Sequence, residues 1–205
     1  MHSFPTRPIW LLLAALVFTS CNAYGPKPTP AQSPTPKPTV QPEATVGPLS
    51  KISVDKLGLT LMMPSTWKPP VDLAENSVVI SPDGSNDTSI TAGPFLLIIV
   101  ADSKFFHSKL SFREGITDPE EQLKAMVTAM NIDAPSVDPV IPYLEAQYPA
   151  AIVRTYERNN QRTIVLMKAG TDRWIYLGAQ APESYFKYYE EAVFKPAANS
   201  ITLNP

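Results

Sequence analysis

The stretch AIVRTYERNNQRTIVLMKAGTDRWIYLGAQA, from Ala151 to Ala181, decides the fold class of this 205-residue chain. It holds three runs rich in β-branched and aromatic residues, which are typical of strands. Turn-forming residues separate the runs, first Asn159-Asn160 and then Gly170-Thr171-Asp172. Connections this short join antiparallel neighbours. The stretch therefore predicts a meander of three paired strands, at Ala151–Arg158, Arg162–Ala169 and Arg173–Ala181.

Further strand-like segments precede this meander. The apolar run Phe95–Val100 is uninterrupted, which predicts a strand buried on both faces. Turn residues at 82–87 separate that run from the strand before it. The complete set of expected earlier strands is Lys51–Asp55, Gly58–Met63, Ser77–Ser81, Phe95–Val100 and Val140–Ala146.

Two segments have the pattern of amphipathic helices. The first opens with Asp118 as N-cap and Pro119 at the first helical position, and it should end near Asn131. Its predicted buried stripe is Leu123, Met126, Val127 and Met130. The second begins at residues 181–183, and Pro196 should bend or end it. Its predicted sheet-facing residues are Tyr185, Phe186, Tyr189, Val193 and Phe194. The expected fold class is α+β, an antiparallel sheet flanked by helices.

The segment from Gly58 to Trp67, an apolar strand running into Pro-x-x-Trp, resembles the opening of PsbP-like domains. The end of the chain is similar too, with a strand at 174–180, then Ala181-Pro182, an aromatic helix and Ser200-Ile201. The resemblance implies an α/β/α sandwich around an antiparallel sheet. It also implies an assembly or binding module of the kind found among extracytoplasmic lipoproteins, and no catalytic residue.

Residues 1–20 have the pattern of an export signal, with Arg7 ahead of an apolar run of about ten residues, too short for a membrane-spanning helix. The ending Phe18-Thr19-Ser20-Cys21 resembles the lipobox of bacterial lipoproteins. That resemblance implies a lipidated Cys21 carrying fatty-acyl groups such as palmitate, and a protein anchored to the extracytoplasmic face of the cell membrane. The alternative is an ordinary signal peptide in which Cys21 happens to fall near the cleavage point.

Residues 21–48 read as a disordered tether, because eight prolines between Pro26 and Pro48 remove amide donors and prevent regular helix or sheet. As polyproline II at ~3.1 Å per residue, the segment 24–48 would span up to roughly 80 Å. A PxxP-type ligand and a glycosylated stalk are alternatives. The globular domain is predicted at 49–205.

Composition excludes several classes of function. The segment 49–205 holds 14 of the 17 basic and 18 of the 19 acidic residues, a net charge of −4, which argues against a nucleic-acid partner. Cys21 is the only cysteine, and His107 is the only histidine beyond the leader. Neither a Cys/His zinc site nor a disulfide can be built from them. The sequence therefore predicts no metal, no cofactor and no enzymatic activity.

Four arginines on or beside the meander form the candidate anion-binding surface: Arg154, Arg158, Arg162 and Arg173. Arg154 and Arg158 share strand parity with Tyr156, so their side chains are expected on one face. Such a face would bind a carboxylate or phosphate through bidentate contacts. The alternative is a set of solvated charges, paired with acids such as Glu157 and Asp172.

Other chemistry-bearing residues have structural interpretations. His107 with Ser108 and Asp102 holds the residue types of a hydrolase, but no Gly-x-Ser-x-Gly elbow occurs, and a loop histidine is preferred. The segment Asp83–Asp87 imitates the start of a calcium loop, yet Thr88 and Pro94 occupy the positions of its Gly and Glu, so an ordinary turn is preferred. The two domain tryptophans, Trp67 and Trp174, are interpreted as core residues rather than a sugar-stacking platform.

These observations favour a noncatalytic, membrane-tethered module that binds a protein partner or an envelope component. A small-ligand carrier, with a pocket between sheet and helix, is the alternative. A hydrolase that uses His107 is the third and least favoured hypothesis.

Overall fold

The structure is a computed structural model that describes residues 46–89, 91–130 and 136–204. The leader, Cys21 and nearly all of the expected tether lie outside these residues. In the described part of the chain, no helix is both long and apolar enough to cross a membrane.

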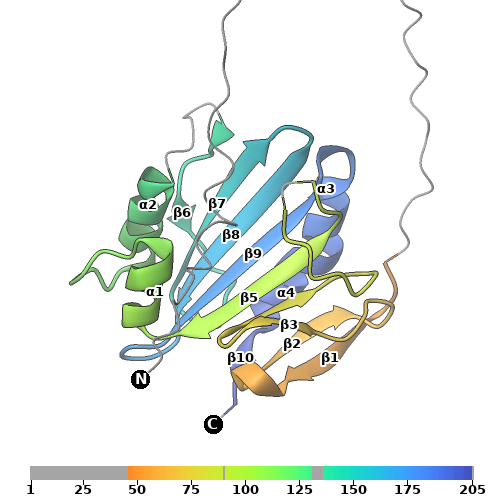
Figure 1. Cartoon of the computed structure of the whole chain (residues 1–205), viewed down its shortest axis with the longest axis horizontal. Coiled ribbons are helices and arrows are strands. Elements are labelled where there is room, and N and C mark those ends of the chain that lie inside the picture. The colour runs from red at the N-terminus through yellow and green to blue at the C-terminus, as the bar shows by residue number, and fades with distance from the viewer. Residues whose placement is uncertain (1–45, 90, 131–135, 205) are drawn as a thin grey trace, which may run out of the picture. The chain divides into compact units, whose positions relative to one another are not determined.

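Seven strands form one antiparallel sheet, in the spatial order β3-β4-β5-β9-β8-β7-β6 (Figure 1). The predicted meander supplies three adjacent strands, in which Glu157 pairs with Asn160 and Lys168 pairs with Trp174. The α+β class and the antiparallel sheet are confirmed. The strands are β3 (Val71–Ala74), β4 (Ser77–Ile80), β5 (Phe95–Ala101), β6 (Ile141–Pro142), β7 (Ala150–Glu157), β8 (Asn160–Lys168) and β9 (Trp174–Pro182).

A second, smaller sheet joins the beginning of the domain to its end. Strand β2 (Leu59–Pro64) lies in the middle, between β1 (Leu49–Val54) and β10 (Thr202–Leu203), and both neighbours run antiparallel to it. A short 3-10 helix, η2 (Asp55–Leu57), connects β1 to β2. The two strands predicted at 51–55 and 58–63 are thus present, but in a sheet of their own.

The large sheet is covered on both faces, which makes the three layers of the expected sandwich. Helices α1 (Ser103–Leu110) and α2 (Pro119–Ala129) pack on one face of β7, β8 and β9. The opposite face is covered by the small sheet together with a continuous helical run near the C-terminus. That run consists of α3 (Glu183–Tyr189), the π-helical segment η4 (Glu190–Phe194) and α4 (Lys195–Ser200).

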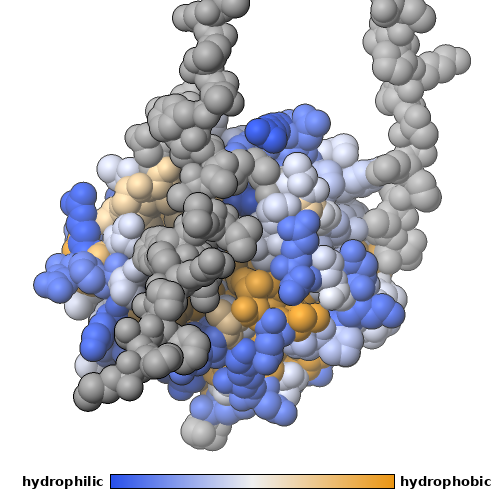
Figure 2. Space-filling view, viewed as in Figure 1, coloured by the Kyte–Doolittle hydropathy of each residue, from blue (hydrophilic) through white to orange (hydrophobic). Residues whose placement is uncertain are grey.

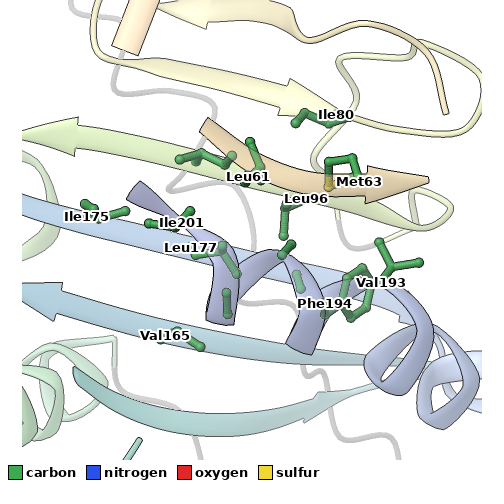
Figure 3. Packing of buried hydrophobic residues seen from close by; sticks show 14 of the residues in the cluster. Leu61, Met63, Ile80, Leu96, Val165, Ile175, Leu177, Val193, Phe194 and Ile201 are labelled. Atoms are coloured by element: carbon green, nitrogen blue, oxygen red, sulfur yellow. The ribbon is translucent and has the colours of Figure 1, made fainter. Parts of the chain in front are cut away.

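The larger core lies between the sheet and this C-terminal run (Figure 3). Leu61 of β2, Leu177 of β9 and Phe194 of η4 meet there, and each is at most 2% exposed. Along β7, β8 and β9, alternate residues point to this core, and the residues between them point to α1 and α2.

The helix predicted from Asp118 is present, and its capping is confirmed. The Asp118 side chain accepts a hydrogen bond from Glu121 N at 2.9 Å, and Pro119 occupies the first turn. Leu123 and Met126 are fully buried. The helix ends at Ala129, however, so Met130 is 39% exposed and its predicted place in the buried stripe is wrong.

Three predictions about the strands and the loop at 102–110 are corrected. His107 lies in helix α1, not in a loop, because Asp102 caps that helix by accepting a hydrogen bond from Phe105 N at 2.7 Å. The expected strand Val140–Ala146 shrinks to β6, whose Pro142 has no amide to donate to a ladder. Strand β5 is fully buried only toward the larger core, since Leu97 and Ile99 on the other face are half-buried.

The two ends of the meander also differ in detail from the prediction. The β7–β8 turn consists of Arg158 and Asn159, one residue earlier than expected, with Arg158 at a φ of 55°. Pro196 does not end the C-terminal helical run, because it lies in the first turn of α4, where no amide donor is needed. The edge strand β3 was not predicted, because it has only four, mostly exposed residues.

Candidate functional site

The end of the sheet where the β8–β9 hairpin meets α1 carries two cavities. Figure 1 shows this hairpin beside the start of α1. One cavity, of about 320 Å³, lies between η2, β5 and Arg173, and the other, of about 280 Å³, lies between α1, the α1–α2 loop and the hairpin. The first volume is at the lower end of the range of about 300 to 1,000 Å³ that is typical of small-molecule sites, and the second is just below it.

Asp172 of the hairpin is bonded to the first residue of α1. Its Oδ1 accepts hydrogen bonds from Ser103 N, at 3.1 Å, and from Ser103 Oγ. These bonds lower the pKa of the Asp172 carboxyl, with a smaller contribution from Lys168. The carboxylate therefore stabilises the fold above the pKa of an unfolded aspartate, and this contribution is lost as the pH falls through the folded pKa.

The His107 side chain holds the α1–α2 loop. Its Nδ1 lies 2.7 Å from the carbonyl oxygen of Phe112. Because a carbonyl oxygen only accepts hydrogen bonds, Nδ1 carries a proton and Nε2 is the ring nitrogen left for another partner.

The three residue types of the hydrolase hypothesis are not assembled into a relay. Ser108 Oγ donates to the carbonyl oxygen of Phe105 at 2.8 Å, within its own helix. The Asp102 carboxylate is the N-cap of that helix. Asp102, His107 and Ser108 each make a hydrogen bond to a backbone group. These bonds stabilise α1 and the loop that follows it.

A buried glutamine fixes the next residue of the loop. Gln122 of α2 is 1% exposed, and its amide accepts from Arg113 N at 3.2 Å and donates to Arg113 O at 3.3 Å. Phe112 is stacked on Phe106, with ring centroids 4.8 Å apart, and meets the Trp174 ring edge-on at 5.1 Å. The α1–α2 loop is therefore held by both helices and by the aromatic core beneath it.

The smaller of the two cavities, called here the basic cavity, has cationic side chains from three separate segments. Lys104 comes from α1, Arg113 from the α1–α2 loop and Lys168 from the end of β8. The Lys168 ammonium lies 5.4 Å from the centroid of the Trp174 ring. The remaining titratable residues that line the basic cavity are His107, Glu114 and Asp172.

In the described part of the chain, none of the cations of the basic cavity makes a close ion pair with a carboxylate, although Lys168 acts on the Asp172 carboxylate at longer range. In residues 46–89, 91–130 and 136–204, the ion pairs join Lys56 to Asp72, Lys124 to Glu120, Arg154 to Glu190 and Lys195 to Glu191, so none involves the basic cavity. No group of three or more metal-ligating side chains occurs in the same part of the chain.

The structure does not bring the four predicted arginines to one surface. Arg154 points to the C-terminal helical run and Arg162 to the other face of the sheet, where it bonds Gln180 and, at 3.4 Å, the carbonyl oxygen of Thr88. Arg158 lies in the exposed β7–β8 turn, and Arg173, at the opposite end of β8 and β9, donates to the carbonyl oxygen of Leu57 at 3.2 Å.

Arg154 makes a partly buried ion pair beneath η4. Its Nε donates to Glu190 Oε1 at 2.7 Å, and the side chains are 30% and 10% exposed. The expected common face with Tyr156 does not make a shared anion site, because the phenol donates to Asp138 at 3.0 Å.

The remaining candidates have the structural roles preferred from the sequence. Asp83 Oδ1 accepts from Ser81 Oγ at 3.0 Å and from Ser85 N at 2.9 Å, which makes a side-chain-supported turn and lowers the pKa of this carboxyl. Trp67 and Trp174 are 9% and 2% exposed, so both are core residues.

Sequence reasoning missed the residues that line the basic cavity. Lys104, Arg113 and Lys168 lie on three segments with no common spacing, so only the folded chain brings them together. One local signal was available: residues three apart are neighbours on a helix, so a predicted helix at 103–110 would have placed Lys104 beside His107.

No protein-family model matches the chain, and no curated protein does. Among solved structures, it is similar to cyanobacterial PsbP (CyanoP) from Synechocystis sp. PCC 6803, with 12% identity, a TM-score of 0.51, and coverage of 78% of this chain and 95% of that one. It is also similar to LpqN, involved in cell envelope biogenesis of Mycobacterium tuberculosis, with 12% identity, a TM-score of 0.47, and coverage of 77% and 91%.

A Bacteroides thetaiotaomicron protein matches with 14% identity and a TM-score of 0.43 over 78% of this chain, which spans only 50% of that protein's length. At such identities a likeness shows the fold and nothing finer. Of these structures, CyanoP is the one whose TM-score supports that conclusion. The chain has a PsbP-like fold.

Proposed function

We propose that this protein is a lipoprotein anchored through Cys21 to the extracytoplasmic face of the cell membrane, and that its domain is a noncatalytic binding module. Its ligand or partner is an envelope component or another envelope protein. The observation that carries the binding proposal is the basic cavity, where the three cations Lys104, Arg113 and Lys168 outnumber the two carboxylates that line it.

The net charge makes this cavity unusual for its domain. Residues 49–205 carry a net charge of −4, so carboxylates that could pair with these cations are plentiful. An excess of cations around a concavity attracts an anion. This excess favours a recognition role for this end of the domain.

The sequence supports the anchor. Cys21 follows an apolar run and two small residues, and it precedes the proline-rich segment. A diacylglyceryl group supplies the two acyl chains that lasting membrane attachment requires, at ~0.8 kcal/mol per buried CH₂. An extended tether would let the domain reach a partner up to roughly 80 Å from the bilayer.

Replacing the cysteine tests the anchor. In cells that produce the full-length protein, Cys21→Ala should move nearly all of it from the membrane fraction to the soluble fraction, because the lipid attachment site is gone. Ser20→Ala is the matched control, since it keeps a small residue at the cleavage point and should leave membrane retention unchanged. Equal retention of both variants in cell fractionation would contradict the lipoprotein proposal.

Photo-crosslinking in intact cells tests the binding role. A photoreactive amino acid at Thr117, an exposed residue that lines the basic cavity, should give a specific product of higher mass. The same group at exposed Lys51, on β1, should not. Identical product patterns from both positions, or no product from either, would count against a partner at this cavity.

A further inference from the structure

We propose that the basic cavity binds a phosphate group, carried on a soluble phosphate ester or on a lipid headgroup. This inference rests on the proposed binding function and adds the chemical class of its ligand. It replaces the anion surface expected on the meander arginines, three of which have internal hydrogen bonds.

The placement of the cations favours phosphate over carboxylate. Lys104, Arg113 and Lys168 line the basic cavity from three separate segments, a helix, a loop and a strand. A planar carboxylate is matched by a single arginine fork, whereas a phosphate presents oxygens in several directions. Three donors around one hollow are the arrangement that a tetrahedral group can use.

Local acids offset part of this charge and leave the basic cavity with three cations against two carboxylates, Glu114 and Asp172. Of the two acidic residues that line the basic cavity, Asp172 is already bonded to Ser103. Glu114 is exposed and lies next to Arg113 in the same loop. In Figure 1 the α1–α2 loop lies at the left edge of the domain. Figure 2, in the same view, shows mostly hydrophilic residues at that edge.

The wall that carries Arg113 is already ordered. Gln122 holds the Arg113 backbone through two hydrogen bonds, and His107 holds the preceding carbonyl group. A ligand that meets a preformed wall has less conformational entropy to offset when it binds.

The anion would be recognised by the charged side chains and not by the backbone amides at the N-terminus of α1. Two amides at the start of this helix are taken by protein carboxylates, Ser103 N by Asp172 and Phe105 N by Asp102. The volume of about 280 Å³ suits a headgroup or a small ester and is too small for a whole lipid. Removing charged side chains should therefore weaken binding directly.

The test uses the full-length protein in a neutral detergent. Glycerol 3-phosphate and inorganic phosphate are titrated by calorimetry against sodium chloride of equal ionic strength. In a second arm, micelles that contain phosphatidylglycerol are compared with micelles that contain diacylglycerol, which lacks phosphate, with tryptophan fluorescence as the signal. Trp174 lies at the basic cavity, and the same titration of a Trp174→Phe variant identifies its share of the signal, because the full-length chain holds three tryptophans.

The decisive variant is the double substitution Lys104→Gln with Arg113→Gln, since both residues are exposed and the fold should tolerate their loss. It should weaken binding at least about tenfold, because two charge-assisted hydrogen bonds are removed. The matched control, Lys51→Gln with Lys187→Gln, removes the same charge from exposed sites on β1 and α3 and should bind as the parent protein does.

Each outcome decides the proposal. Binding of the soluble phosphates that only the Lys104/Arg113 variant weakens supports it and identifies a soluble ester as the source. The same dependence seen only with phosphatidylglycerol supports a lipid headgroup. No binding of any probe, or equal loss in both double variants, overturns it. If the Thr117 crosslink still forms in that case, the binding function survives and only the phosphate assignment fails.

Discussion

Phe106→Ala is expected to lower the free energy of unfolding by about 3 to 5 kcal/mol. Phe106 is 0% exposed and stacks on Phe112 in the core beneath α1. Alanine at this position removes apolar contacts and leaves a cavity that a helix held at both ends cannot close. The same ring supports the loop residue before Arg113, so the substitution should also impair the basic cavity.

Urea denaturation of the full-length protein measures the effect. Leu144→Ala is the control, because Leu144 is 91% exposed and its truncation should change stability by no more than about 0.5 kcal/mol. A loss of less than about 1 kcal/mol for Phe106→Ala would show that α1 does not pack on the sheet as described.

Arg154→Met should cost about 2 to 4 kcal/mol, somewhat less than a fully buried pair because Arg154 is partly exposed. The substitution keeps most of the apolar stem but leaves the Glu190 carboxylate without its cation. The Glu190 side chain is 10% exposed and faces Thr163 of the sheet, so water cannot replace the guanidinium fully. The penalty comes from the stranded charge.

A second substitution separates this cause from lost packing. Adding Glu190→Gln to Arg154→Met removes the stranded charge and should restore more than half of the lost stability, as measured by denaturant unfolding. Lys124→Met is the surface comparison, because the Lys124–Glu120 pair is solvent-exposed and its loss should have no measurable effect. A double variant less stable than the single one would contradict the stranded-charge explanation.

The elements predicted correctly are those with strong local signals. The meander was predicted from turn residues between β-branched runs, and α2 from Asp118 and Pro119. Helix α1 was missed because it has eight residues and only one fully buried side chain, Phe106. In so short a helix the apolar pattern is too brief to stand out, although Asp102 marks its start.

The candidate site was less predictable than the fold, and the arginines show why. Strand parity alone could not reveal that Arg154 and Arg162 lie on opposite faces of the sheet with different partners. The pairing of β7 with β8 decides that, and their common turn contains Arg158, one residue before the expected position. The lipid anchor at Cys21 lies outside the described residues and stays a prediction.

From the sequence alone, periodicity, turn chemistry and capping determined the α+β class, the antiparallel meander and α2, because each depends on residues close together in the chain. Composition determined that Cys/His zinc and disulfide chemistry cannot be built in the domain. Only the tertiary structure decided where the excess of cations lies. Lys104, Arg113 and Lys168 are up to 64 positions apart, and they share one cavity because β8, α1 and the loop after α1 pack against the same aromatic core.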